Sequence, residues 1–139
     1  MAQGIRHPGL RRALEVLLPE EDLQIRLLLS FPTSNSAADH GARLAPDSAF
    51  ENIANASCDT WQTVAESGAL IRQNAALISF GVLQEDLSQV VGWAVFDGSG
   101  AEMLAFGPLV DSSGAEIARS FLAGDEVQFP IGALKVGLS

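Results

Sequence analysis

The chain has 139 residues, of which 47% are hydrophobic and 18% charged, and its net charge is −9. These values are typical of one globular domain and exclude a disordered segment. A single cysteine excludes an internal disulfide and an all-cysteine zinc site, and no apolar run approaches the roughly 20 residues of a membrane helix.

The N-terminal segment is basic, whereas the rest of the chain is acidic. Arg6, Arg11 and Arg12 give the first 14 positions a charge of +3. Because the whole chain carries −9, the remaining residues together carry −12. Such an acidic body predicts no binding to nucleic acid, which depends on neutralising phosphates. The basic arm suits contact with an acidic surface of another protein, or else Arg11 and Arg12 lie on the solvated face of a helix. Acidic residues interrupt the apolar segment of a possible secretory signal, so we expect a mature product made in the cytoplasm.

The first third of the chain predicts a helix, a strand and a loop. Residues 9–18 place apolar side chains at the spacing of one helical face, between two prolines that favour its start and its end. Residues 23–31 alternate and predict a strand. Residues 32–48 are rich in Ser, Asn, Ala and Gly and predict a long functional or mobile loop. Residues 49–56 are ambiguous between a short helix and an irregular strand.

From residue 60 onwards, the sequence predicts short strands separated by turns. They cover residues 61–66, 70–80, 90–96, 102–106, 115–121, 127–129 and 134–138. Asp97-Gly98, between two apolar runs, is a strong hairpin signal. We therefore predict a mainly β fold, with one antiparallel β-sandwich or jelly-roll-like domain over residues 23–139. An arm and a short helix precede it over residues 1–22.

Motifs that suggest chemistry have simpler structural explanations. The segment 97–100 begins like a calcium loop, but Glu102 comes too early to serve as the bidentate ligand. The acidic pairs at 20–21, 85–86 and 125–126 fall in predicted turns, where nothing apolar would raise a carboxyl pKa. Cys58 has no basic neighbour to stabilise a thiolate. We therefore expect no enzymatic activity, no catalytic residue, no cofactor and no metal.

Two tryptophans lie in strand-like segments. A platform that stacks on bases or sugars would favour basic residues interleaved with the tryptophans, and none are interleaved with Trp61 or Trp93. Packing in the core or at an interface is therefore the preferred interpretation. The candidate protein-contact residues are Arg6, His7, Arg11, Arg12, Trp61 and Trp93.

Four segments of the second half follow the pattern of a known family. They are Asn74 to Phe80, the run Gly92-Trp93-Ala94-Val95-Phe96-Asp97, the run Leu104-Ala105-Phe106-Gly107-Pro108-Leu109, and Ala123-Gly124-Asp125 followed by Phe129 to Leu138. In these the chain resembles a group of small tailed-phage virion proteins over about residues 69–139. It departs from the group at Ala101-Glu102, where two glycines are usual, and again after the first strand, at residues 31–35.

The resemblance implies a structural protein of a tailed-bacteriophage virion. Its expected role is that of a capsid decoration, or cement, protein that stabilises the head through protein–protein contacts. The alternative is a tail-fibre, baseplate or adaptor component that presents the domain for host attachment. The expected partners are the major capsid protein or tail proteins of the same virion and further copies of this chain as a homo-oligomer, with no nucleic acid and no membrane. A carbohydrate-active enzyme is disfavoured because no credible carboxylate pair is present.

Overall fold

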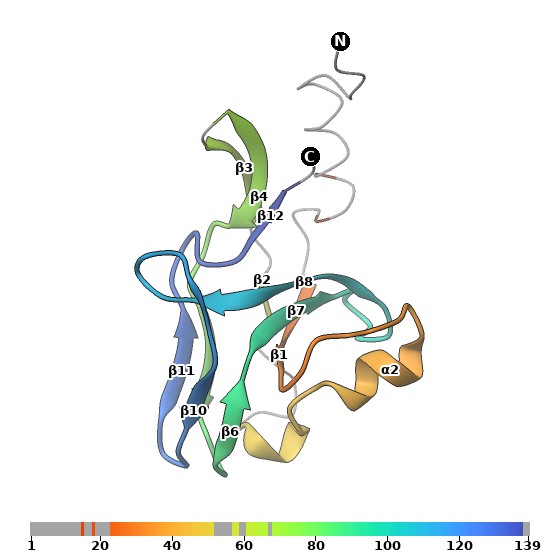
Figure 1. Cartoon of the computed structure of the whole chain (residues 1–139), viewed down its shortest axis with the longest axis vertical. Coiled ribbons are helices and arrows are strands. Elements are labelled where there is room, and N and C mark those ends of the chain that lie inside the picture. The colour runs from red at the N-terminus through yellow and green to blue at the C-terminus, as the bar shows by residue number, and fades with distance from the viewer. Residues whose placement is uncertain are drawn as a thin grey trace.

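The computed structural model describes residues 15, 18, 23–51, 57–58, 61–66 and 68–137. Over these residues the fold is mainly β, with antiparallel sheets and little helix (Figure 1), as the sequence predicts. The predicted N-terminal helix lies outside the described residues, apart from positions 15 and 18. No helix in the described part is long and apolar enough to span a membrane.

The strands form four antiparallel groups. In chain order they are β1 (Leu23–Leu28), β2 (Ser57–Cys58), β3 (Trp61–Glu66), β4 (Ala69–Asn74), β5 (Ile78–Val82), β6 (Leu87–Val90), β7 (Gly92–Phe96), β8 (Met103–Val110), β9 (Glu116–Ile117), β10 (Arg119–Phe121), β11 (Glu126–Phe129) and β12 (Lys135–Gly137). The largest sheet has the order β2-β1-β7-β8-β9, and a three-stranded sheet has the order β12-β4-β3. Two-stranded ribbons join β10 to β6 and β11 to β5.

The expected hairpin at Asp97-Gly98 is confirmed, because β7 and β8 pair antiparallel on either side of it. The Asp97 carboxylate accepts hydrogen bonds from the Ser99 hydroxyl at 2.8 Å and from the Ala101 N–H at 3.1 Å. These bonds close a turn, and the Ser99 hydroxyl is the main reason why the pKa of Asp97 lies below its ordinary value.

The same turn recurs between β8 and β9, where the sequence Asp-x-Ser-Gly-Ala is repeated. The Asp111 carboxylate accepts from the Ser113 hydroxyl at 2.6 Å and from the Ala115 N–H at 3.0 Å. Its pKa is also lowered, chiefly by the Ser113 hydroxyl. Both ends of β8 are therefore defined by one kind of local hydrogen bonding.

One hydrophobic core draws side chains from most of the strands. Its larger buried members are Leu23, Ile25, Leu27, Trp61, Ile78, Phe80, Leu87, Trp93, Val95, Val127 and Leu134. Alternation along β1 and β7 directs every second side chain to this core. Trp93 packs against Gly107 of the neighbouring strand, where a Cβ atom would lie 2.5 Å from Cζ2 of the indole. The glycine is therefore required by the close approach of the ring.

Asn74 joins two corners of the fold. Its side chain is fully buried, and its Nδ2 donates to the carbonyls of Ala76 at 2.9 Å and Pro130 at 3.0 Å. Its Oδ1 accepts from the Leu134 N–H at 3.0 Å, and its backbone carbonyl accepts from Gly132 at 3.0 Å. The β4–β5 corner is thus held against the β11–β12 corner.

The projecting sheet is anchored to the body at its base. Figure 1 shows the β3–β4 hairpin extending beyond the strands that enclose the core. Arg72 of β4 is buried, and it donates to the Leu18 carbonyl at 2.7 Å and to the Thr63 hydroxyl at 3.1 Å. Trp61 begins β3 inside the core, so one strand belongs to both the body and the projection.

Two sequence-based expectations are wrong in detail. Residues 32–48 are not a long structureless loop, because they contain helix α2 (Ala37–Ala42), with Ser36 as its N-cap, and most of the 3₁₀ turn η1 (Asp47–Ala49). Residues 70–80 are not one strand, because the chain leaves β4 at Asn74 and starts again at β5. Of residues 49–56, only 49–51 are described, and there Phe50 bridges to Leu83.

Replacing Asn74 with Ala should lower the free energy of unfolding by about 3 kcal/mol, because buried backbone groups lose their only side-chain partner. Urea unfolding followed by circular dichroism measures the change. Asn35→Ala, at an exposed position, is the matched control and should change stability by less than about 0.5 kcal/mol. Equal losses in the two variants would contradict the role given to Asn74.

Gly107→Ala should lower the free energy of unfolding by about 1–3 kcal/mol, because the new methyl group overlaps the Trp93 ring. It should also change the tryptophan fluorescence of the folded protein. Gly41→Ala is the control: nothing lies within 4 Å of the added atom, and helix propensity favours Ala by about 1 kcal/mol. A Gly107→Ala protein as stable as the wild type would show that the ring has room to move.

Candidate functional site

The outer face of the five-stranded sheet carries exposed apolar side chains. Phe106 is 49% exposed, and its ring centroid lies 6.1 Å from that of Phe31, which is 38% exposed. Pro108 and Val110 follow at alternate positions of β8 and therefore share its outer face. We call Phe31, Phe106, Pro108 and Val110 the outer patch. A contiguous apolar surface of this kind is typical of a contact site for another molecule.

A second, smaller cluster lies beside the outer patch on the same face of the sheet. Leu28, Ala94 and Phe96 are buried there, with Leu44 and Met103 packed against them. The Phe31 ring lies against Gly92, where a Cβ atom would come within 2.9 Å of Cε1 of the ring. Phe31 can occupy this position because residue 92 has no side chain.

The segment that carries Phe31 is held by a hydrogen-bond network around Asp39. One carboxylate oxygen accepts from the backbone N–H groups of Thr33 at 2.8 Å and Ser34 at 3.0 Å. The other accepts from Nε of Arg43 at 3.0 Å and from its Nη2 at 2.8 Å. Arg43 also donates to the Ser30 hydroxyl at 3.2 Å. These bonds connect α2 to the chain directly after Phe31.

The charge of Asp39 is stabilised by its donors. The Arg43 hydrogen bonds and the Thr33 and Ser34 N–H groups lower its pKa from 3.8 to about 2. The backbone adds two contacts between this segment and β1: Leu29 donates to the Arg43 carbonyl at 2.8 Å, and Ala45 donates to the Leu27 carbonyl at 3.0 Å. Residues 29–45 thus form an ordered cover beside the outer patch.

A partly buried ion pair lies on the same face of the sheet. Arg26, opposite Ala94 in the register of β1 and β7, contacts Asp47 of η1 at 2.6 Å. Burial lowers the pKa of Arg26, while the Asp47 charge acts in the opposite direction. The pair attaches η1 to the edge of the outer face, so helix α2 is fixed at both of its ends.

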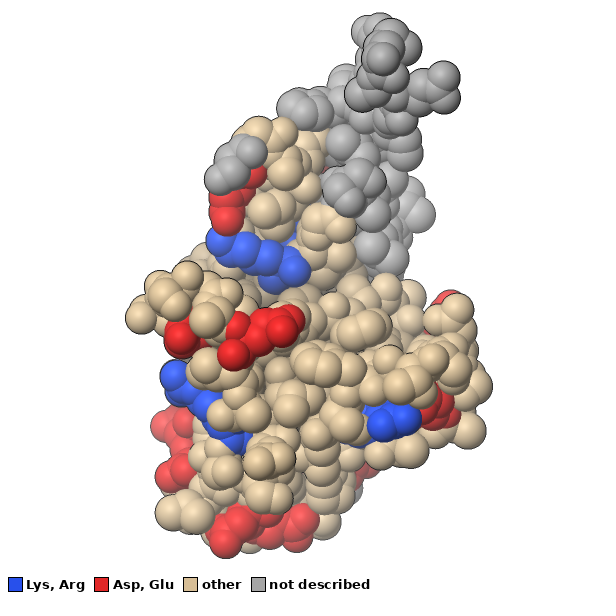
Figure 2. Space-filling model, in the orientation of Figure 1, with Lys and Arg blue, Asp and Glu red and all other residues tan. Residues whose placement is uncertain are grey.

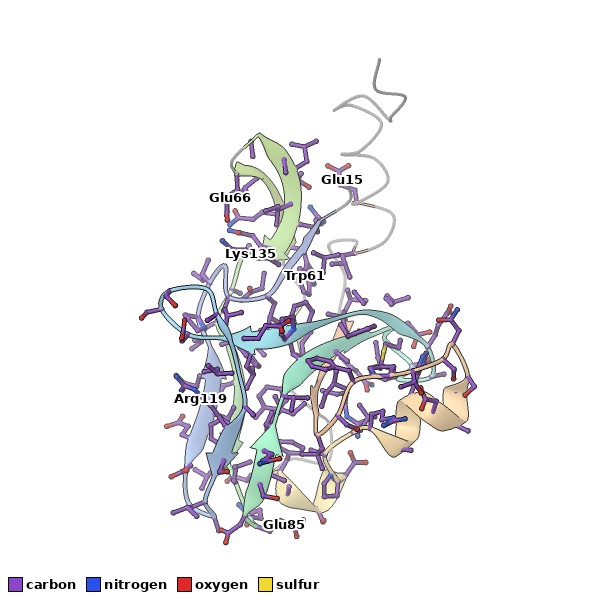
Figure 3. All side chains as sticks on the ribbon, viewed as in Figure 1. Glu15, Trp61, Glu66, Glu85, Arg119 and Lys135 are labelled. Carbon is purple, nitrogen blue, oxygen red and sulfur yellow. The ribbon has the colours of Figure 1, made fainter. Side chains whose placement is uncertain are left out.

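The candidate contact residues suggested by the sequence are placed differently from the outer patch. Trp61 and Trp93 lie in the core, with 0% and 4% of their surface exposed, and Figure 3 marks Trp61 at the base of the projecting hairpin. Their side chains therefore contribute packing rather than surface. Arg6, His7, Arg11 and Arg12 lie outside the described residues, as do the side chain of Cys58 and the pair at 20–21.

In the described turns, the aspartate of each acidic pair accepts a hydrogen bond from a backbone N–H group. Asp86 accepts from the Ala123 N–H at 2.7 Å, and Asp125 accepts from the Leu122 N–H at 2.8 Å. Glu126 accepts from the Gln128 amide at 2.9 Å. Among the described residues, no group of three or more His, Cys, Asp or Glu side chains is arranged to hold a metal ion.

The outer patch was not found by sequence reasoning. Phe31 ends the first predicted strand, and Phe106 lies in a strand whose two faces could not be assigned to inside and outside. The pairing of Gly107 with Trp93, which places Phe106 on the outer face, comes from the register of the folded sheet. No protein-family model matches the chain, and neither a curated protein nor a solved structure is significantly similar to it.

The Asp39 network should weaken in acid. Because the pKa of Asp39 is lowered in the folded protein, its contribution to stability is complete above pH 3.8 and is lost as the pH falls through about 2. A carboxyl-detected NMR titration should give a midpoint near 2 for Asp39. Amide exchange at residues 30–36 should accelerate over the same range.

Asp39→Asn is the control variant for this titration. It should remove the pH dependence of exchange at residues 30–36 over this range and leave that at the turns 97–101 and 111–115 unchanged. An Asp39 midpoint near 3.8 would contradict the network.

Proposed function

We propose that the chain is a structural protein of a tailed-bacteriophage virion and that it acts as a capsid decoration protein. The observation that carries the proposal is that residues of the family resemblance lie in buried positions that hold the fold together. Asn74 is the buried link between two corners, and Trp93 packs on Gly107 in the core. The shared residues therefore specify a fold, and a role based on contacts between surfaces agrees with that.

The last segment of the resemblance has a similar structural role. The turn at Ala123-Gly124-Asp125 has Gly124 at a φ of 96°, and Gly132 has a φ of 82° beside the Asn74 carbonyl. A positive φ of this size favours glycine. The backbone at these positions adopts a conformation that side chains other than glycine rarely allow. A shared pattern of glycines and turn residues is therefore expected of proteins with a shared fold.

We infer that the antiparallel sheets pack face to face as a β-sandwich. The support is the main core, to which β1 and β7 of the largest sheet contribute on one side and β5 and β11 on the other. A sandwich leaves the outer face of each sheet free for contacts. In this fold the outer patch is the face that β1, β7 and β8 present away from the core.

The surface suits a particle component that remains soluble while it presents one apolar contact. Figure 2 shows acidic groups scattered over the face in view rather than gathered in one patch. The net charge of −9 disfavours nonspecific association. The outer patch is an apolar region at which another protein can nevertheless make contact. We propose the major capsid protein as the partner of this patch, with the basic N-terminal arm as a second contact and further copies of this chain in a homo-oligomer.

The proposal is tested on purified particles of a phage that encodes this chain. Quantitative mass spectrometry should find the chain in numbers comparable to the capsomers. A few copies per particle would place it in the tail, as a fibre, baseplate or adaptor component, and its absence from particles would refute a virion role.

The contact surface is tested by decorating particles that lack the chain with purified variants. Phe106→Ala should bind roughly tenfold more weakly, as expected for an aromatic residue central to an interface. Leu122→Ala is the control, because Leu122 is 64% exposed but lies in the turn between β10 and β11. Equal binding of both variants would exclude the outer patch as the contact.

A further inference from the structure

The strands β10 and β11 follow one another in the chain but do not pair. The turn between them has the hydrogen bond of a tight hairpin, from the Asp125 N–H to the Leu122 carbonyl at 3.0 Å. Strands leaving such a turn normally pair with each other. Here β10 pairs with β6 and β11 pairs with β5, and no backbone hydrogen bond joins β10 to β11 in the part of the chain that the structure describes.

The turn is held by the link between β5 and β6, which explains why the two strands separate. Leu83 donates to the Asp125 carbonyl and accepts from the Gly124 N–H, both at 2.8 Å. Asp86 accepts from the Ala123 N–H at 2.7 Å. The groups that would start a β10–β11 ladder are therefore bonded elsewhere, and each strand keeps one edge without a neighbouring strand. Such an edge presents the N–H and C=O groups of alternate residues.

A groove of about 780 Å³ is lined by residues of both strands. Its apolar lining includes Trp93, Leu109, Phe121, Val127 and Phe129. The volume falls within the range of about 300–1,000 Å³ found for ligand sites. Figure 1 shows β10 and β11 side by side, with the loop that leads from β8 to β9 near their upper ends. An apolar floor between two strand edges is suited to an extended backbone with side chains on one face.

Most of the charges at the groove already have partners. Lys135 and Glu66 form an ion pair at 2.6 Å, and Glu126 accepts from the Gln128 amide. Arg119 is exposed and, within the described residues, has neither an ion pair nor a side-chain hydrogen bond (Figure 3). A guanidinium group keeps its charge at all physiological pH values and matches the geometry of a carboxylate. The groove therefore offers one positive group for an anionic side chain.

We propose that the groove between β10 and β11 binds an extended segment of another polypeptide, which adds as a strand to their free edges and places an acidic side chain on Arg119. Backbone hydrogen bonds would supply affinity, and the apolar floor would select alternate side chains, as in other cases of strand addition. The groove adjoins the outer patch and shares Pro108 and Val110 with it, but Phe31 and Phe106 do not line it. The inference does not depend on where in a particle the chain resides.

The probe is a display library of random linear twelve-residue peptides, selected on the full chain. Enriched peptides should alternate apolar residues and carry Asp or Glu near the centre. Amide shifts in NMR spectra of the labelled protein should change along residues 119–121 and 126–129. A library that yields no binder, or one whose shifts fall outside these two strands, overturns the proposal.

Arg119→Glu and peptide variants test the two parts of the interaction separately. Arg119→Glu should weaken binding of the acidic peptide at least about fivefold and strengthen binding of its twin with Lys in place of the acid. Glu102→Lys, a charge change away from the groove, should leave binding within about twofold. Methylating alternate backbone nitrogens of the peptide should weaken binding in either register, because one set of N–H groups faces β10 and the other faces β11.

Two results would identify a different interaction. Binding that survives methylation in either register would exclude addition of a strand between the two edges. Self-association of the free chain that Arg119→Glu abolishes, measured by sedimentation, would make a second copy the occupant and would overturn the assignment to another polypeptide.

Discussion

The buried amide of Asn74 is the interaction on which the arrangement of the sheets depends. It supplies hydrogen bonds to the Ala76 and Pro130 carbonyls and to the Leu134 N–H, in corners where no strand can supply them. Because the side chain is fully buried, water cannot replace these bonds, and leaving such groups unpaired is costly. The corner after β4 and the corner after β11 must therefore meet, and β12 is placed beside β4. The projecting hairpin and the core follow from that meeting.

Acidic residues in turns make a second contribution to the fold. The carboxylates of Asp39, Asp86, Asp97, Asp111 and Asp125 all accept hydrogen bonds from backbone N–H groups. For Asp39, Asp97 and Asp111 the donors lower the pKa, which extends the range of the charged form further into acid. Part of the negative charge of the chain is thus structural. In each acidic pair that is described, the aspartate belongs to this pattern, whereas Glu85 accepts from the Ser48 hydroxyl and Glu126 from the Gln128 amide.

The two proposed contact surfaces arise in different ways. The outer patch exists because a pleated sheet has two faces and β8 carries apolar residues on both, with Gly107 facing the core and Phe106 facing outward. The groove exists because Leu83 binds the turn at Gly124 and Asp125, so that neighbouring strands join different ribbons. In both cases the surface stays exposed because the core is packed by other residues of the chain.

The sequence by itself determined the features that depend on neighbours in the chain. Alternation and turn residues predicted a mainly β fold, the hairpin at Asp97-Gly98 and the presence of a strand at each tryptophan, because pleat and turn geometry are properties of a few consecutive residues. Only the tertiary structure decided the order of residues 32–48, the division of 70–80 at Asn74 and the separation of β10 from β11. Each of these depends on partners distant in sequence, such as β1 for the segment ending at Arg43 and Pro130 for Asn74. A local pattern contains no information about which distant residue will contact it in the folded chain. Those contacts determine whether a polar loop becomes ordered and whether a strand edge remains unpaired.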